Sequence, residues 1–221
     1  MPAVSVLRAS HATDASSASP PQSSPGALQR STLPRDFYRR DPRVVAPELL
    51  NKILVAPDGR SGRIVEVEAY CGAEDPAAHT YRGQTARNAT MFGPPGHMYV
   101  YFTYGMHWCA NTVCGDEGEG WGVLLRALEP LTGLERMRVS RPKAKRDTEL
   151  CSGPARLTQA LGITGVNNGA DLVLGDQDLR VVSDGTPAGD TAVASQRIGI
   201  SQAREHPWRW HLAGNAHVSR K

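Results

Sequence analysis

The sequence has few features of a nucleotide-binding, esterase or metal-dependent enzyme. It contains no G-x-x-x-x-G-K-[ST] loop, no strand-linked G-x-G-x-x-G and no G-x-S-x-G, so nucleotide hydrolysis, dinucleotide binding and ester hydrolysis lack their usual support. Its four cysteines form no C-x-x-C pair, and its seven histidines form no H-E-x-x-H. We therefore expect no metal and no redox motif, and we interpret the cysteines as buried free thiols.

Long apolar runs are also missing. No stretch approaches the roughly 18 residues of a membrane-spanning helix, and the N-terminus lacks the continuous apolar segment of a secretory signal. These absences predict a cytoplasmic protein, associated with the nucleoid if the source is bacterial. The formal net charge of +3 favours a polyanionic partner only slightly.

The composition changes along the chain and predicts its domain organisation. Residues 1–32 are rich in Ser, Ala and Pro and show no periodicity, so they cannot bury enough surface to offset the entropy of ordering. We expect a disordered N-terminal tail over 1–32, one folded domain over 33–215 and a short C-terminal tail over 216–221. With 40% hydrophobic and 21% charged residues in 221, the chain can form one substantial core.

Runs of β-forming residues between turn signals predict an antiparallel arrangement. The expected strands lie at 52–56, 63–70, 97–114 (as two strands), 120–130, 170–185 and 195–201. The first two form a hairpin around Asp58 and Gly59, and 97–114 forms a second hairpin with Tyr104 at or near its tip.

Helical segments are short. One is expected to begin near Pro47, one lies within 131–142, and one begins with Ser152 as its N-cap and stops at Gly162. The order of elements predicts a single α+β domain with a mixed, mostly antiparallel β-sheet core and surrounding short helices.

The segment "GRIVEVEAY", residues 62–70, has an unusual polar face. Side chains alternate along a strand, so Glu66, Glu68 and Tyr70 share the face opposite Val65 and Val67. A solvated sheet face is the ordinary explanation, and the lining of a pocket is the alternative. Further aromatic residues, His79, Tyr81, Tyr99, Tyr101 and Tyr104, follow nearby; aromatic clusters are usually core, but they also form stacking pockets.

Five blocks in this order resemble the alkyladenine (3-methyladenine) DNA glycosylase family. They are "GRIVEVEAY", "EDPAAHTYRGQTARNATMFGPPGHMYVYFTYGMHWCAN", "GVLLRALEP", "ELCSGPARLTQAL" and "RIGIS". The resemblance runs from about Leu33 to about Ala213. It implies the alkyladenine glycosylase fold, which is similar to the C-terminal domain of formyltransferases.

The resemblance also implies a function and a set of site residues. The implied enzyme is a monomeric, monofunctional DNA glycosylase without metal or organic cofactor, which flips alkylated or deaminated purines out of double-stranded DNA and hydrolyses the N-glycosidic bond with a carboxylate-activated water, initiating base excision repair. The implied roles are Glu68 as general base, Arg126 near this carboxylate and the DNA backbone, Tyr70, His79 and Tyr101 as pocket walls, Asn111 as the pocket floor, and Tyr104 as the wedge that enters DNA.

The chemistry of these residues agrees with the resemblance. An extruded purine needs aromatic faces to stack on, and an alkylated purine is a cation that such faces attract. The gap left in the duplex needs a plug, which a tyrosine at a hairpin tip can supply. A carboxylate can then activate water. This role explains why one face of the strand at 62–70 is polar.

Several alternatives remain open from the sequence. Glu66 is interpreted as a solvated or salt-bridged strand residue. Arg126 could serve only a structural ion pair, His79 could be a buried structural ring, and Asn111 could satisfy backbone groups near the hairpin. The alternative function is a non-catalytic protein that binds damaged DNA on the same scaffold. A helix-hairpin-helix glycosylase is disfavoured because "LGITGVNNGADL" has the wrong glycine spacing and the lysine nucleophile is missing.

Overall fold

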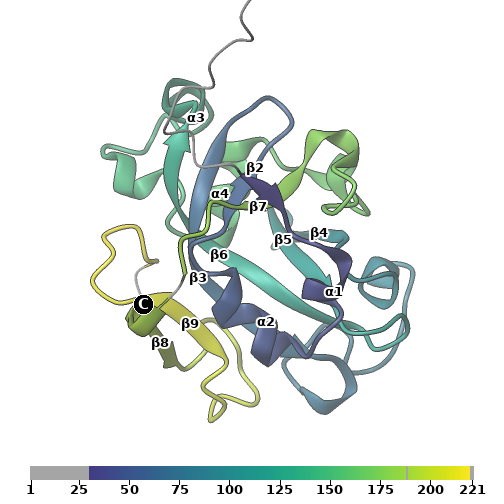
Figure 1. Ribbon diagram of the computed structural model, residues 1–221. Helices are drawn as coiled ribbons and strands as arrows, with labels where there is room; N and C mark the ends of the chain where they lie inside the picture. Colours follow the sequence, from purple (N-terminus) through teal and green to yellow (C-terminus); the bar gives the residue numbers. More distant parts are fainter. Residues whose placement is uncertain (1–29, 188, 220–221) are drawn as a thin grey trace, which may run out of the picture.

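The computed structural model describes residues 30–187 and 189–219 (Figure 1). Most of the predicted N-terminal tail lies outside these residues. The described strands are β1 (Ser31–Thr32), β2 (Ile53–Val55), β3 (Ser61–Cys71), β4 (Met98–Thr103), β5 (His107–Cys114), β6 (Trp121–Thr132), β7 (Arg180–Ser183), β8 (Ala192–Ser195) and β9 (Arg209–Leu212). The α-helices are α1 (Arg35–Tyr38), α2 (Pro42–Leu49), α3 (Leu134–Ser140) and α4 (Pro154–Leu161).

These strands form one nine-stranded sheet, as the α+β prediction requires. Its order is β1-β7-β2-β3-β6-β5-β4, and β9 joins it by pairing with β3 and β8. Every pairing between the described strands is antiparallel. Strand β3 pairs with β6 along its length, with β2 near its start and with β9 in its middle. It is therefore central, and its side chains are enclosed.

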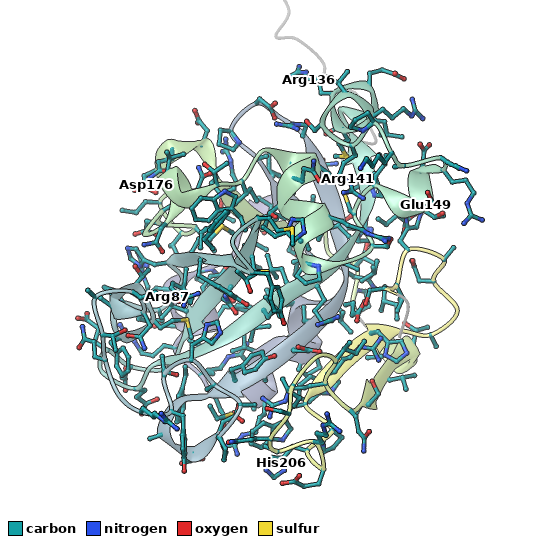
Figure 2. All side chains as sticks on the ribbon, turned by 180° about the vertical axis from the view of Figure 1, so that it is seen from behind. Arg87, Arg136, Arg141, Glu149, Asp176 and His206 are labelled. Atoms are coloured by element: carbon teal, nitrogen blue, oxygen red, sulfur yellow. The ribbon has the colours of Figure 1, made fainter. Side chains whose placement is uncertain are left out.

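Helices cover the two faces of this sheet. Helix α2 packs on β3 and β6 on the face seen in Figure 1, whereas α4 packs on β5 and β6 on the face seen in Figure 2. The main core includes Leu49, Val67, Leu125 and Leu157, one from each of α2, β3, β6 and α4, and each is fully buried. The sheet thus lies between its helices, and Glu68, Tyr70, Asn111 and Arg126 are on its inner strands.

Two helix boundaries differ from the prediction. Helix α2 begins at Pro42 rather than near Pro47, because the side chain of Asp41 caps it by accepting a hydrogen bond of 2.7 Å from the backbone N–H of Arg43. Helix α4 has Gly153 as its N-cap residue, with no side-chain cap from Ser152. Its predicted stop is confirmed, since Gly162 adopts φ 70° at the C-cap.

The late strands differ more from the prediction. Of 170–185, only Arg180–Ser183 is a strand. The segment 195–201 is a loop after its first residue, and Gly199 within it has φ 79°, a conformation that interrupts a strand. Strand β9 is not predicted by any local pattern. The hairpins β2–β3 and β4–β5 and the strand β6 are confirmed, although β6 continues two residues past Pro130.

Candidate active site

The carboxylates on β3 lie where both β3 and β6 are irregular. Ile64 pairs with Leu128, Glu66 with Ala127, and Val67 with Leu125, so one residue on each strand is left out of the register. On β6 that residue is Arg126. Bulges re-aim side chains beside active sites, and here the Arg126 guanidinium reaches both carboxylates: its Nε donates to Glu66 Oε1 at 2.9 Å, and its Nη1 lies 3.1 Å from Glu68 Oε1.

The polar face of β3 is not solvated. Glu66 and Glu68 are both 0% exposed, so the solvated-face explanation of this strand is wrong. Buried carboxylates require hydrogen-bond or ion-pair partners. Glu66 and Glu68 have different sets of partners.

Glu66 is held by a complete set of donors. Its Oε1 accepts from Arg126, from Arg209 Nε at 2.7 Å and from the Ser219 hydroxyl at 2.8 Å, and its Oε2 accepts from the Ser219 backbone N–H at 2.6 Å. Burial acts to raise the pKa of Glu66, but Arg126, Arg209 and Ser219 outweigh burial and hold the pKa below its ordinary value. Glu66 is therefore an ionised, salt-bridged residue, as one of its two interpretations expected. Residues 216–219 of the predicted C-terminal tail fold back onto the sheet through Ser219, which is 7% exposed.

Glu68 has fewer donors and lies against a cavity. The Tyr70 hydroxyl donates to its Oε2 at 2.8 Å, and the Ile198 backbone N–H donates to its Oε1 at 2.8 Å. With the Arg126 contact this makes three partners, whereas a carboxylate can accept about four hydrogen bonds. Tyr70, Arg126 and Ile198 all line a cavity of about 480 Å³. One acceptor position on Glu68 thus remains for a water molecule.

The cavity brings together the predicted pocket residues. Its lining includes Tyr70, His79, Tyr101, Tyr104, Asn111 and Arg126. The ring of His79 stands edge-on to Tyr101 with centroids 4.6 Å apart, and Tyr101 stacks on Tyr99 at 5.4 Å. Tyr99 is 1% exposed and also lines the cavity, so it supports Tyr101 as a packed neighbour in the same wall. The aromatic residues are therefore a wall backed by the core.

Two of these aromatic groups are held in their neutral forms. Burial first, and then the charge of Glu68, raises the pKa of Tyr70, so its hydroxyl keeps the proton that it donates to Glu68. His79 lies at the rim, open to solvent on one side. The protein packed around it, and after that the charge of Arg87, lowers its pKa. A neutral imidazole both donates and accepts hydrogen bonds at a base edge.

Tyr104 forms the tip of the β4–β5 hairpin. It has φ 50°, followed by Gly105 with φ 66°, and Met106 N–H donates to the Thr103 carbonyl at 3.2 Å, which is the geometry of a type I′ turn. Positive φ is uncommon for a bulky residue. The Tyr104 side chain is 83% exposed, so core packing does not explain it. Phe102 and Met106 beside it are 43% and 66% exposed, and the tip is an apolar projection.

Asn111 lies on β5 in the cavity wall and is 5% exposed. Its Nδ2 is 3.5 Å from the Tyr99 carbonyl, at the limit of a hydrogen bond. The backbone-satisfying interpretation of Asn111 thus has one weak contact. The amide otherwise lies in the wall of the cavity.

Sequence reasoning missed the segment that completes the carboxylate site. Arg197 and Asp75 form an ion pair with both side chains 0% exposed, with Nη1 to Oδ2 at 2.5 Å. The Arg197 guanidinium also donates to the Ala69 carbonyl at 3.0 Å and packs over the Tyr70 ring, 4.8 Å from its centroid. These contacts anchor the loop that carries the Ile198 N–H to Glu68. The signal in the sequence is "RIGIS", whose pattern predicts a strand instead.

No group of three or more His, Cys, Asp or Glu that could hold a metal ion occurs within 30–187 and 189–219. In the same described part, no helix is long and apolar enough to cross a membrane. The cysteines, Cys71, Cys109, Cys114 and Cys151, are free and buried, as predicted.

Comparison with known proteins decides the family. The family model described as methylpurine-DNA glycosylase (MPG) matches residues 36–216. The chain belongs to the methylpurine-DNA glycosylase family. A relative from Burkholderia lata, named "Putative 3-methyladenine DNA glycosylase", is 62% identical over 195 residues, which cover 88% of this chain and 92% of the relative. The family resemblance and the enzyme class predicted from the sequence are therefore confirmed.

More distant relatives bear the same name. One from Koribacter versatilis is 48% identical over 198 residues, covering 87% of this chain and 95% of the relative. One from Methanoculleus marisnigri is 49% identical over 199 residues, covering 86% of this chain and all of the relative.

Proposed function

We propose that this glycosylase flips 3-methyladenine and other alkylated or deaminated purines out of duplex DNA and hydrolyses their N-glycosidic bonds with a water activated by Glu68. The observation that carries the proposal is the Glu68 carboxylate, fully buried directly behind the cavity wall, with three partners and one acceptor position left. The names of the relatives support 3-methyladenine as a substrate.

The cavity fits a flipped purine. A volume of about 480 Å³ with tyrosine rings and His79 in its wall offers stacking faces to a base, and each such contact is worth about 1–3 kcal/mol. A positively charged alkylated purine is attracted further by the faces of Tyr70 and Tyr101. The bare, strained Tyr104 tip at the cavity mouth is suited to fill the gap that the flipped nucleotide leaves.

The hydrolytic step follows from the position of Glu68. As the bond between C1′ and the base nitrogen breaks, its electron pair leaves with the base, and the sugar becomes oxocarbenium-like. The oxygen of a water held by Glu68 bonds to C1′, and the carboxylate accepts the water proton. A cationic alkylated purine departs as a neutral base, whereas a neutral deaminated purine departs as its anion and takes up a proton from solvent water. Arg126, whose Nη1 lies 3.1 Å from Glu68 Oε1, holds the carboxylate in position during this step.

Release of free base from a duplex that contains one hypoxanthine or 3-methyladenine tests the proposal. The chain should release the base and leave an abasic site without cutting the strand. Tight binding of the damaged duplex without any release would instead favour the non-catalytic alternative.

Tyr104→Ala tests the wedge separately. It should weaken binding to a lesion in a duplex more than to the same lesion in a single strand, because only the duplex has a stack to fill. Equal losses on both substrates would leave Tyr104 without a role as a wedge.

A further inference from the structure

A second cavity, about 720 Å³ in volume, lies beside the proposed base pocket. Its wall comes from the segment between α3 and α4, from α4 itself, from the start of β5 and from residues near the C-terminus. The charged side chains in this wall are Arg141, Lys143, Arg146, Arg156 and Glu149. Figure 2 shows Arg141 and Glu149 on the face that carries α4. Four cations thus face one carboxylate.

The single carboxylate does not neutralise all of the cations. Arg146 Nη2 pairs with Glu149 Oε1 at 2.9 Å. Arg141 and Arg156 have no carboxylate oxygen within 4 Å among the described residues. Arg141 Nη1 donates to Gln159 Oε1 at 2.8 Å, and Arg156 Nη1 donates to Ser152 Oγ at 3.1 Å. Arg141 Nη2 also donates to the Glu149 carbonyl at 3.4 Å. These neutral acceptors orient the two guanidinium groups, and the more distant Glu149 carboxylate offsets only part of their charge.

Arg141 shows that this arrangement is costly without an anion. Its Nε is buried and has no acceptor in the described part of the chain. Burial, followed by the charge of Arg156, lowers the pKa of Arg141. The two guanidinium groups repel each other, and one of them has a buried donor without an acceptor. Guanidinium groups bind phosphate through several hydrogen bonds in one plane, so a phosphate would suit this pair.

The location relates this cavity to DNA. Pro154 in the first turn of α4 lines the base pocket, while Ser152 and Ala155 on either side of it line the second cavity. His107, three residues after Tyr104, also lines the second cavity. A strand whose nucleotide enters the base pocket beside Tyr104 therefore places a neighbouring phosphate near Arg141 and Arg156.

We propose that Arg141 and Arg156 form a binding site for a backbone phosphate of the DNA strand that runs past the base pocket. The inference rests on the proposed function, since it takes duplex DNA as the substrate. The site fixes the register of the strand without reading its sequence, because phosphate contacts position a duplex and base contacts specify it.

Salt-dependent binding to an undamaged duplex tests this site without requiring base release. Each neutralised phosphate adds about 0.9 to the slope of log affinity against log salt concentration. We expect Arg141→Gln/Arg156→Gln to lower the slope by about 0.9 for each phosphate that the variant no longer neutralises. Arg141→Lys/Arg156→Lys, which keeps both charges, should retain most of the slope. Arg141 is half-buried, so the double variant could lose stability. Arg156→Gln alone changes an exposed position and is the second variant, which should fold.

The matched control is Arg40→Gln/Arg180→Gln, which changes the net charge equally. Arg40 pairs with Glu48 at 2.7 Å and Arg180 with Asp178 at 3.8 Å, and neither lines the cavity. The control should leave the slope unchanged. Equal slopes for parent and site variants, or an equal fall in the control, would overturn the site. Base release by the parent is scored separately, so a failed phosphate site and a failed glycosylase are distinguishable.

Discussion

Glu66 and Glu68 are two residues apart on one strand, are equally buried and share Arg126, yet they have different surroundings. Glu66 accepts from four donor atoms, which use its acceptor capacity. Glu68 has three partners, all of which line the cavity. Burial and charge therefore do not distinguish the two carboxylates. The unused acceptor position beside the cavity does, and it is the reason for proposing Glu68 as the base.

The two carboxylates are also linked. Arg126 is fixed by Glu66 and contacts Glu68, while Glu66 is fixed by Arg209 and Ser219. The backbone N–H groups of Ser219 and Ile198, both from the last part of the chain, each hold one carboxylate. We infer that Glu66 positions Arg126 and that Glu68 performs the chemistry.

Glu68→Gln should have the largest effect on activity. The amide keeps the shape of the side chain but cannot accept the water proton, so base release should fall by about 10²–10⁴-fold. Binding of damaged duplex should survive. Single-turnover base release and equilibrium binding on the same duplex measure the two effects. Release within tenfold of the parent would contradict the assignment of Glu68 as the base.

Glu66→Gln should mainly affect stability. Removing one charge from a buried ion network leaves Arg209 without its carboxylate and Arg126 with Glu68 alone, and such losses cost about 3–5 kcal/mol. Base release by the folded fraction should fall less than for Glu68→Gln, because the base itself remains. Denaturant unfolding, with activity measured well below the transition, separates the two quantities. A more severe loss of activity than in Glu68→Gln would reverse the roles of the two carboxylates.

The lowered pKa of Glu66 predicts how the stability of the protein changes in acid. A carboxyl whose pKa is lowered by folding stabilises the protein above the ordinary Glu pKa, about 4.3, and that stabilisation is lost as the pH falls through the folded value. The unfolding temperature of the parent should therefore fall more steeply below about pH 4.3 than that of Glu66→Gln. Parallel curves would mean that Glu66 is not held as the anion.

Local sequence patterns predicted the surroundings of Glu68 better than those of Glu66. The alternation in 62–70 placed Tyr70 beside Glu68, and their 2.8 Å hydrogen bond spans two residues. The turn residues at Tyr104 and Gly105 likewise predicted the hairpin tip. The partners of Glu66 come from 143 and 153 residues away, in Arg209 and Ser219. Alternation within one strand contains no information about such contacts.

The same reasoning explains the misassigned loop. "RIGIS" alternates like a strand, but the Arg197 guanidinium pairs with Asp75, 122 residues away, and Gly199 takes a positive φ. The chain path there is set by a buried ion pair, which outweighs the weak β-preference of a short apolar run. The contact of the Ile198 N–H with Glu68 was therefore not predictable from local sequence, whereas the family resemblance supplied the site residues directly.

Ser219→Ala should have the smallest effect and distinguishes support from chemistry most finely. The variant removes the hydroxyl that donates to Glu66 Oε1 at 2.8 Å but keeps the backbone N–H that donates to Oε2 at 2.6 Å. Arg126 and Arg209 still compensate the charge, so the loss is one hydrogen bond to an ion, about 1.5–3 kcal/mol of stability. Base release should stay within a few-fold of the parent, because Arg126 keeps its contact with Glu68. Measured together with Glu66→Gln, a graded loss of stability at nearly constant activity would show that the Glu66 network holds the fold. A fall in base release as large as that of Glu68→Gln, in a variant with near-parent stability, would show that the network reaches the reacting water.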